Sequence, residues 1–154
     1  MARSQLSLPV PGFEEVDRAS LIGIALSALS KAYAPYSHFS VAAAALFSSG
    51  TLYTGVNVEN ASYPAGICAE RNAIFHAVAE GEKRLRAIAI VAGKNGIPGE
   101  HCTPCGICRQ VMREFGKPNE ILVILAQSPT QYTELTLEDL LPRSFGPEDL
   151  LAEE

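Results

Sequence analysis

The chain has 154 residues, of which 47% are hydrophobic, and this length suits one compact domain with a single core. Its formal net charge is −5 and its 12 basic residues are scattered, whereas a polynucleotide-binding protein needs clustered Lys and Arg. The longest apolar runs, such as residues 41–47, fall far below the roughly 18–20 residues that cross a bilayer, and residues 1–12 lack a secretory signal. We therefore expect a soluble cytoplasmic protein without a membrane or nucleic-acid partner.

Two prolines and a glycine interrupt the start of the chain, so we expect a flexible arm over residues 1–12 and a single domain over residues 13–154. Acidic side chains within residues 14–17 then favour the start of a helix, because they complement its dipole. Apolar residues follow at helical spacing up to the Ala-Pro step at residues 34–35. This pattern predicts a first helix that ends near that step.

Short apolar segments make up most of the remaining chain. Residues 41–47 and 51–58 flank a Ser-Ser-Gly turn, which predicts a β-hairpin. We then expect a helix over residues 67–80, a strand over 86–92, a loop over 93–99, a helix over 105–115, a strand over 121–126, an edge strand over 132–135 and a short helix over 137–141. Helices that alternate with short apolar strands predict an α/β fold, a three-layer α/β/α sandwich whose mixed sheet of about five strands begins with an antiparallel pair.

The cysteines carry the clearest chemical signal. Cys105 and Cys108 are three residues apart, and Cys68 stands two residues before Glu70. A catalytic zinc site supplies three protein ligands and leaves the fourth position open, and zinc accepts thiolates readily. Both segments begin predicted helices, where N–H groups and the helix dipole favour anions and lower thiol pKa values. The three cysteines therefore predict one zinc ion per chain with an acid beside it.

Helix geometry separates the roles of the neighbouring residues. Side chains two positions apart do not share a helix face, so Cys68 and Glu70 address one metal only if it lies beyond the helix end. Glu70 is then placed to exchange protons with bound water rather than to ligate the metal. Three thiolates on Zn²⁺ leave a net charge of about −1, which Arg71 is expected to offset by donating to a ligand sulfur.

Five short segments share the order in which a known family carries them. They are Tyr-Ser-His-Phe at residues 36–39, Asn-Val-Glu-Asn-Ala at 57–61, Cys-Ala-Glu at 68–70, Pro-Cys-Gly-Ile-Cys at 104–108 and Leu-Leu-Pro-Arg-Ser-Phe at 140–145. Together they resemble the small cytidine deaminases over nearly the whole chain. The resemblance implies that family's fold and the hydrolysis of cytidine and 2′-deoxycytidine to uridine and 2′-deoxyuridine with release of ammonia, a step of pyrimidine salvage. It also implies a homotetramer whose subunits share active sites.

At matched positions the resemblance assigns individual roles. Cys68, Cys105 and Cys108 would ligate zinc, and Glu70 would carry a proton from bound water to ring N3 and then to the leaving amine. The other roles concern the pyrimidine nucleoside: Asn57 and Glu59 would bind the ribose, the Ala69 backbone the pyrimidine edge, the Thr103 carbonyl the leaving amine and Phe39 the base, whereas Ala61, Tyr63 and Phe145 would reach a neighbouring subunit's site.

Other interpretations of the same residues stay open. Cys102 as a fourth ligand would close the centre into a structural zinc site in a non-catalytic protein. Cys105 and Cys108 alone fit a thioredoxin-like redox pair, but this leaves the Cys-Ala-Glu segment without a role. Another small deaminase of the same fold, such as blasticidin S deaminase, shares both cysteine motifs, whereas the Asn-Val-Glu segment at residues 57–59 favours a ribose-bearing substrate. The acidic balance disfavours a polynucleotide-editing deaminase.

Overall fold

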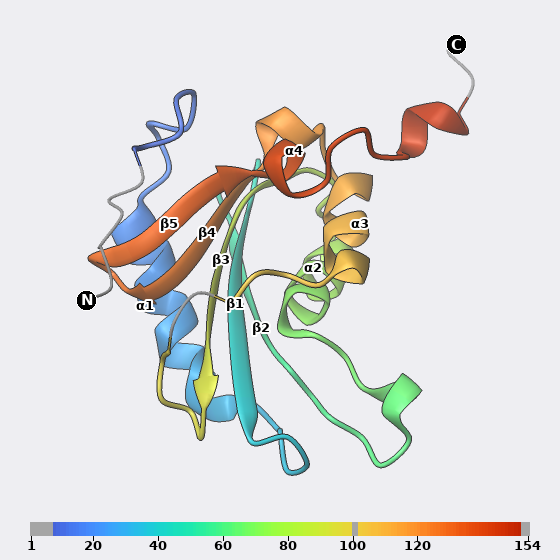
Figure 1. Ribbon diagram of the computed structural model, residues 1–154. Helices are drawn as coiled ribbons and strands as arrows, with labels where there is room; N and C mark the ends of the chain where they lie inside the picture. The colour runs from blue at the N-terminus through green and yellow to red at the C-terminus, as the bar shows by residue number, and fades with distance from the viewer. Residues whose placement is uncertain (1–7, 100–101, 152–154) are drawn as a thin grey trace.

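A mixed five-stranded sheet forms the centre of the molecule in the computed structural model, which describes residues 8–99 and 102–151. The strands are β1 (Phe39–Phe47), β2 (Leu52–Val56), β3 (Leu85–Lys94), β4 (Leu122–Ser128) and β5 (Gln131–Thr136), and the helices are α1 (Arg18–Ala28), α2 (Ala69–Ala79), α3 (Gly106–Glu114) and α4 (Leu137–Leu140). The strand order is β2-β1-β3-β4-β5, in which β3 and β4 run parallel and the other neighbours run antiparallel. Helices flank the sheet on both sides (Figure 1), which confirms the predicted three-layer α/β/α sandwich.

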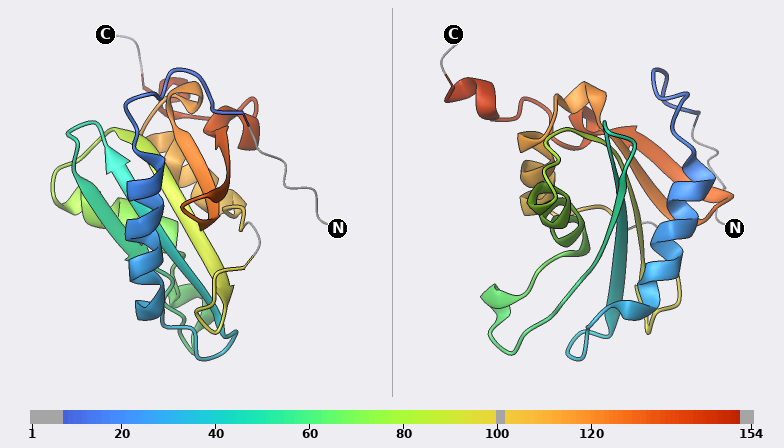
Figure 2. Two further views of the ribbon diagram at one scale, coloured as in Figure 1. Left: turned by 90° about the vertical axis from the view of Figure 1, so that its left-hand side faces the viewer. Right: turned by 180° about the vertical axis from the view of Figure 1, so that it is seen from behind.

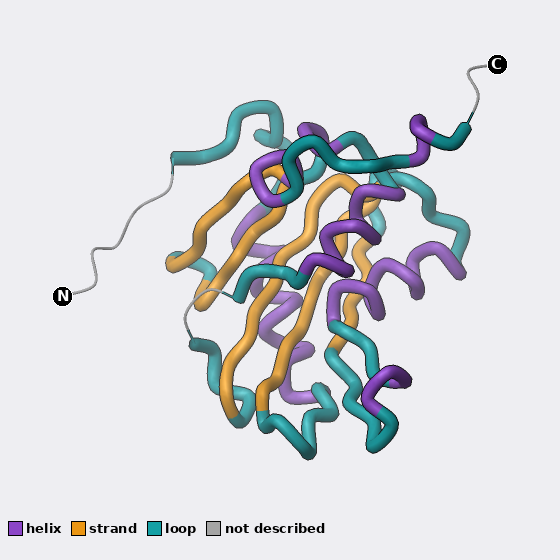
Figure 3. Tube along the Cα trace, turned by 45° about the vertical axis from the view of Figure 1, so that its right-hand side comes forward, coloured by secondary structure: helices purple, strands orange, loops and turns teal. Residues whose placement is uncertain are grey.

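The two faces of the sheet carry separate cores because side chains alternate along each strand. Under α1, the central strands present the alanines Ala42 and Ala44 of β1 and Ala87 and Ala89 of β3, all fully buried. Such small side chains let α1 lie close to the sheet backbone. The opposite face carries larger residues beneath α2 and α3, and Figures 2 and 3 show these helices on the far side of the strands from α1.

The predicted end of the first helix is wrong, because a long-range contact replaces the helical pattern. The α-helix ends at Ala28 and a short 3₁₀ turn covers Leu29–Lys31. The Tyr33 N–H then donates to the Asn57 carbonyl at 3.0 Å, which ties this segment to the chain that follows β2. The predicted β-hairpin is confirmed, with its turn at residues 48–50.

Strand β3 extends further than the sequence predicts. The sequence predicts a loop over residues 93–99, but Gly93 and Lys94 continue the strand. Lys94 pairs with Phe39 of β1. The turn comes only afterwards, at Asn95 and Gly96, both of which have positive φ. In the described ranges none of the helices is long and apolar enough to span a membrane.

A buried ion pair joins the start of α1 to the edge strand β5. Glu134 is 6% exposed, and its two carboxylate oxygens accept hydrogen bonds from Arg18 at 2.9 and 3.0 Å. The Val10 N–H also donates to this carboxylate, at 2.5 Å. The pair therefore anchors residues 10–18 on the sheet. The predicted flexibility of the arm stays a prediction, because residues 1–7 lie outside the described residues.

Removing the anion from this pair is expected to destabilise the fold. In Glu134→Ala the Arg18 guanidinium stays largely buried without its partner, so the free energy of unfolding should fall by about 3–5 kcal/mol. Urea denaturation measures the change, with Glu138→Ala as the control because Glu138 is exposed on α4 and should cost no more than about 0.5 kcal/mol. Equal losses in the two variants would show that the pair contributes little.

Candidate metal centre

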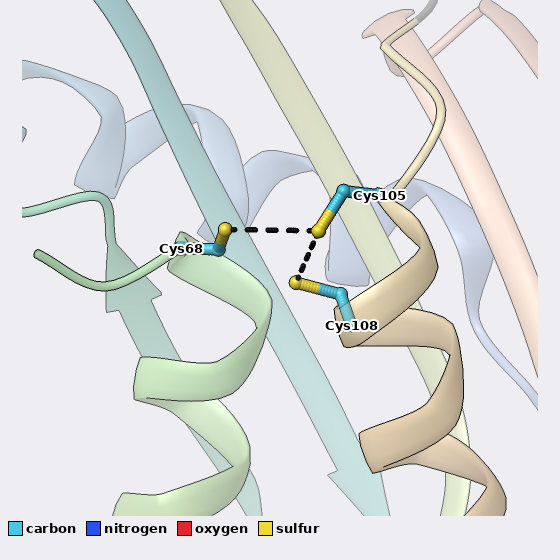
Figure 4. A group of neighbouring side chains, drawn as sticks. All are labelled: Cys68, Cys105 and Cys108. Carbon is cyan, nitrogen blue, oxygen red and sulfur yellow. Dashed lines mark hydrogen bonds between the residues drawn. The ribbon is translucent and has the colours of Figure 1, made fainter. Parts of the chain in front are cut away.

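Three cysteines converge where α2 and α3 begin. Cys68 is the N-cap residue of α2 and Cys105 that of α3, and Cys108 lies in the first turn of α3. The sulfur atoms all lie within 4.8 Å of one another, with Cys68 3.9 Å from Cys105 and Cys105 3.4 Å from Cys108. Figure 4 shows the three side chains pointing into one space between the two helix ends. The structure thus brings together the three cysteines that the sequence marks as metal ligands.

The donor chemistry of this cluster fits zinc. All three are free thiols, and two helix N-termini supply positive potential that favours their ionised form. The pKa of Cys68 is lowered to about 5, chiefly by the neighbouring Cys108 thiol and also by Arg71, whereas the pKa of Cys108 is raised, chiefly by its contact with Cys68. The Arg71 guanidinium donates to the Cys68 sulfur at 3.4 Å, the contact expected from the sequence. The two helix N-termini and Arg71 would therefore offset part of the negative charge of three thiolates that hold a soft divalent ion.

Glu70 lies beside the cysteine cluster and is almost fully shielded from solvent. Its side chain is buried, with 4% of the residue exposed, and one carboxylate oxygen accepts from the Cys108 sulfur at 3.2 Å. Burial raises the pKa of Glu70, because a low-dielectric surrounding disfavours the charged form. A carboxyl group with a raised pKa next to a metal centre is suited to accept and return a proton.

A cavity of about 610 Å³ adjoins the cluster, which is within the usual size of small-molecule sites. Its walls come from the turn before β1, Val41 of β1, the segment between β2 and α2, the first turn of α2 and the segment before α3. Of the residues with an expected role, those that line it are Asn57, Glu59, Tyr63, Cys68, Ala69, Glu70, Arg71, Thr103 and Cys105. The same cavity is thus lined by two cysteines of the metal cluster and by the polar side chains of Asn57 and Glu59.

Asn57 is fixed to β1 by both ends of its side-chain amide. Its Oδ1 accepts from the Val41 N–H at 2.9 Å, and its Nδ2 donates to the Phe39 carbonyl at 2.8 Å. One amide hydrogen and one lone pair remain available to a ligand, because each of these atoms can make a second hydrogen bond. The amide therefore faces the cavity in a preset orientation.

Glu59 is held in a comparable way by the turn before β1. Its Oε1 accepts from the N–H groups of Tyr36 and Ser37 at 3.0 and 3.1 Å. The pKa of Glu59 is lowered by Ser37, through its side chain and its N–H group, and by the Tyr36 N–H. The carboxylate is consequently ionised at neutral pH and offers its second oxygen to donors in the cavity.

Besides the expected metal ligand Cys108, three predicted site residues are not among the described cavity walls. Phe39 is 38% exposed, and its carbonyl accepts from Asn57 at 2.8 Å. Ala61 is exposed on the segment between β2 and α2, and Phe145 is 58% exposed on the segment after α4. The resemblance assigns Ala61 and Phe145 to a neighbouring subunit's site, so all three roles stay predictions.

Several walls of the cavity were not expected from the sequence. They are Tyr36, Ser37, Val41, Val58, Asn60, Gly66, Ile67 and Cys102. The Tyr-Ser pair stood in a segment that carried the resemblance, but nothing in its residue types indicated that its N–H groups bind Glu59. The rings of Tyr36 and Tyr63 meet edge to face with centroids 6.4 Å apart, so aromatic surface borders the cavity.

Cys102 lines the cavity without joining the cluster. Within the described ranges, the group that can hold a metal consists of Cys68, Cys105 and Cys108. The Cys102 sulfur lies 4.0 Å from the Thr103 carbonyl and is not one of the three sulfur atoms that lie within 4.8 Å of one another. The geometry therefore favours an open three-cysteine centre over a closed four-cysteine one.

Known proteins resemble the chain over most of its length. Residues 16–124 match the family model of the cytidine and deoxycytidylate deaminase zinc-binding region. The cytidine deaminase of Halalkalibacterium halodurans is 44% identical over 136 residues, which cover 88% of this chain and 98% of the relative. That of Mycobacterium tuberculosis is 42% identical over 136 residues, covering 88% and 95%. The crystal structure of cytidine deaminase from Burkholderia pseudomallei matches with a TM-score of 0.73 at 44% identity, over 82% of this chain and 97% of that one.

Serine variants of the four cysteines distinguish the three expected metal ligands from Cys102. We expect Cys68→Ser, Cys105→Ser and Cys108→Ser each to lose most bound zinc, because one of three thiolate ligands is gone. Cys102→Ser should keep about one zinc per chain. Elemental analysis of the desalted proteins measures the metal. Zinc loss in Cys102→Ser as severe as in the other three would contradict the open centre.

Proposed function

Because the chain belongs to the family of cytidine and deoxycytidylate deaminases that bind zinc, we propose that it hydrolyses cytidine and 2′-deoxycytidine. Water adds at C4 of the ring, the C4–N bond breaks, and the products are uridine or 2′-deoxyuridine and ammonia. The observation that carries the proposal is the buried Glu70 carboxyl group beside three clustered thiols at one end of a cavity. No other arrangement of the described residues joins metal ligands, an acid and a cavity in this way.

Each residue around the metal would have a separate role in the reaction. Cys68, Cys105 and Cys108 would hold zinc, which when bound supplies a water molecule acidic enough to act as a nucleophile near neutral pH. Arg71 would offset the excess negative charge of the thiolates through its hydrogen bond to Cys68. Glu70 would accept a proton from the attacking water, deliver it to ring N3 and later protonate the leaving amine. Its raised pKa supports both halves of that cycle.

Backbone groups on the cavity wall would orient the pyrimidine. Ala69 stands between Cys68 and Glu70 in the chain, so a ring edge bonded to its backbone would lie beside both. The Thr103 carbonyl would accept hydrogen bonds from the departing ammonia. Phe39 would add apolar contact to the base. These roles follow the resemblance, and the position of Ala69 and Thr103 on the cavity wall supports two of them.

The polar end of the cavity suits a ribose. Asn57 and the ionised Glu59 offer an amide and a carboxylate oxygen to sugar hydroxyls, and both are oriented by backbone groups before a ligand arrives. Arg71 is the one cationic side chain among the described walls, and it already donates to Cys68. A nucleotide phosphate would therefore lack a partner, which supports a nucleoside substrate.

We also propose that the protein works as a homotetramer with shared sites, which the sequence resemblance implies. Exposed apolar side chains on α2, on α3, on the segment between β2 and α2 and on the C-terminal segment support this proposal. They include Phe75 at 45%, Ile107 at 62%, Phe145 at 58% and Tyr63 at 78% exposure. Such side chains are suited to an interface between copies of the chain. The role in pyrimidine salvage and the cytoplasmic location stay predictions from the sequence.

The Glu70 carboxyl group provides the sharpest test of the chemistry. Glu70→Gln keeps the shape but cannot shuttle protons, so kcat should fall by roughly 10²–10⁴-fold while zinc content is retained. The loss of ultraviolet absorbance as cytidine becomes uridine measures the rate. Full activity in Glu70→Gln would exclude the proposed role. If the zinc-loaded wild type leaves cytidine unchanged, blasticidin S becomes the next substrate to assay.

Glu59 should act on binding more than on chemistry. We expect Glu59→Gln to raise KM for cytidine about tenfold with little change in kcat, since a hydrogen bond to a charged group is worth about 1.5–3 kcal/mol. 2′,3′-Dideoxycytidine is the matched control, because it lacks the hydroxyl groups that Glu59 would bind. An equal rise in KM for both substrates would show that Glu59 acts elsewhere.

A further inference from the structure

The backbone of β2 touches the first turns of α2 with no side chain between them. An ideal Cβ placed on Gly55 would lie 2.3 Å from the Ala73 nitrogen and 2.4 Å from the Ala69 oxygen. Both atoms belong to the helix backbone, so neither can turn aside as a flexible side chain would. Only glycine permits this approach, and the contact sets the distance between the strand and the start of the helix.

A side-chain hydrogen bond fixes the same turn of the helix. Asn72 donates from Nδ2 to the carbonyl of Val56, the residue after Gly55, at 3.0 Å. The Asn72 N–H meanwhile bonds to the Cys68 carbonyl at 3.0 Å, within the first turn. Gly55 therefore limits how far α2 stands from β2, and Asn72 limits how α2 is rotated. We refer to these two contacts as the β2–α2 clasp.

The chain continues from the clasp into the polar end of the cavity. Asn57 follows Val56 directly and Glu59 comes two residues later; we call these two residues the ribose side. Between them, the Val58 N–H and carbonyl pair with the carbonyl and N–H of Ile67 at 3.0 and 2.9 Å. Ile67 immediately precedes the first cysteine, so residues 55–59 run alongside residues 67–73 through several fixed contacts.

We infer that Gly55 and Asn72 are positioning residues that set the spacing between the ribose side and the metal side, which consists of Cys68 and Glu70. This inference rests on the proposed function. Neither residue is among the described walls of the cavity, so both act through the position of α2. A methyl group at Gly55 forces the helix start to retreat by about 1 Å to reach ordinary van der Waals contact. A shift of that size in an active site costs roughly 10²-fold in rate.

Two substrates separate positioning from a general loss of stability. Cytidine must satisfy both sides of the cavity at once, whereas 2′,3′-dideoxycytidine lacks the hydroxyl groups that reach the ribose side. In Gly55→Ala we expect kcat/KM to fall roughly 10²-fold for cytidine but less than about fivefold for the dideoxy substrate. A variant that merely folds poorly would lose the same factor with both.

Zinc content and uridine binding give readouts that do not depend on turnover. Gly55→Ala should retain about one zinc per chain, because its three cysteines are intact, while calorimetry should show uridine bound about tenfold more weakly. Gly23→Ala on α1 is the matched control, since an ideal Cβ on Gly23 meets no atom within 4 Å. We expect this control to match the wild type within about twofold in every measurement.

Asn72→Asp keeps the inference testable if Gly55→Ala does not fold. The aspartate preserves the shape of the side chain but removes the N–H that donates to Val56. It should show the same preference for the dideoxy substrate with smaller factors. Equal losses for both substrates in the folded variants, or no loss in either variant, would overturn the inference. A wild-type enzyme inactive on cytidine would refute the proposed function instead.

Discussion

The site depends on the meeting of two helix N-termini at one point. Three thiol groups within 4.8 Å of one another repel as soon as more than one of them ionises, so a cluster of this kind needs positive charge from several directions. The first turns of α2 and α3 supply it through their dipoles, and Arg71 adds a guanidinium against the Cys68 sulfur. Zinc completes the compensation, which explains why the ligands occupy helix starts rather than helix interiors.

The sheet makes this meeting possible by placing both helices on one face. α2 packs against β1 and β2, and α3 packs on the same core through Cys108 and Met112. The other face, where alanines of β1 and β3 meet α1, carries no part of the described cavity. The face of the sheet that packs against α1, with the Arg18–Glu134 pair, thus contributes to stability, whereas the face that carries α2 and α3 holds the metal ligands and the cavity.

Much of this arrangement was predictable from the sequence, since it depends on residue type and spacing. The alternation of short apolar strands and helices indicated the layered fold, and the spacing of Cys68, Cys105 and Cys108 indicated the metal centre. The missed features join residues that are distant in sequence. The N–H of Tyr33, which follows the first helix, bonds to the Asn57 carbonyl, and Glu59 is held by Tyr36 and Ser37. Similarly, Gly55 reads as an ordinary strand residue until a helix backbone is found against it. No local pattern encodes such partners.

The central claim is that the zinc centre has three cysteine ligands and an open position beside Glu70. X-ray absorption at the zinc edge of the purified protein tests it most directly, because it counts the atoms bound to the metal. The account predicts three sulfur atoms at about 2.3 Å and one lighter atom at about 2.0 Å. Four sulfur atoms would contradict it, because the fourth ligand would then be Cys102 and the centre would be closed to a nucleophilic water.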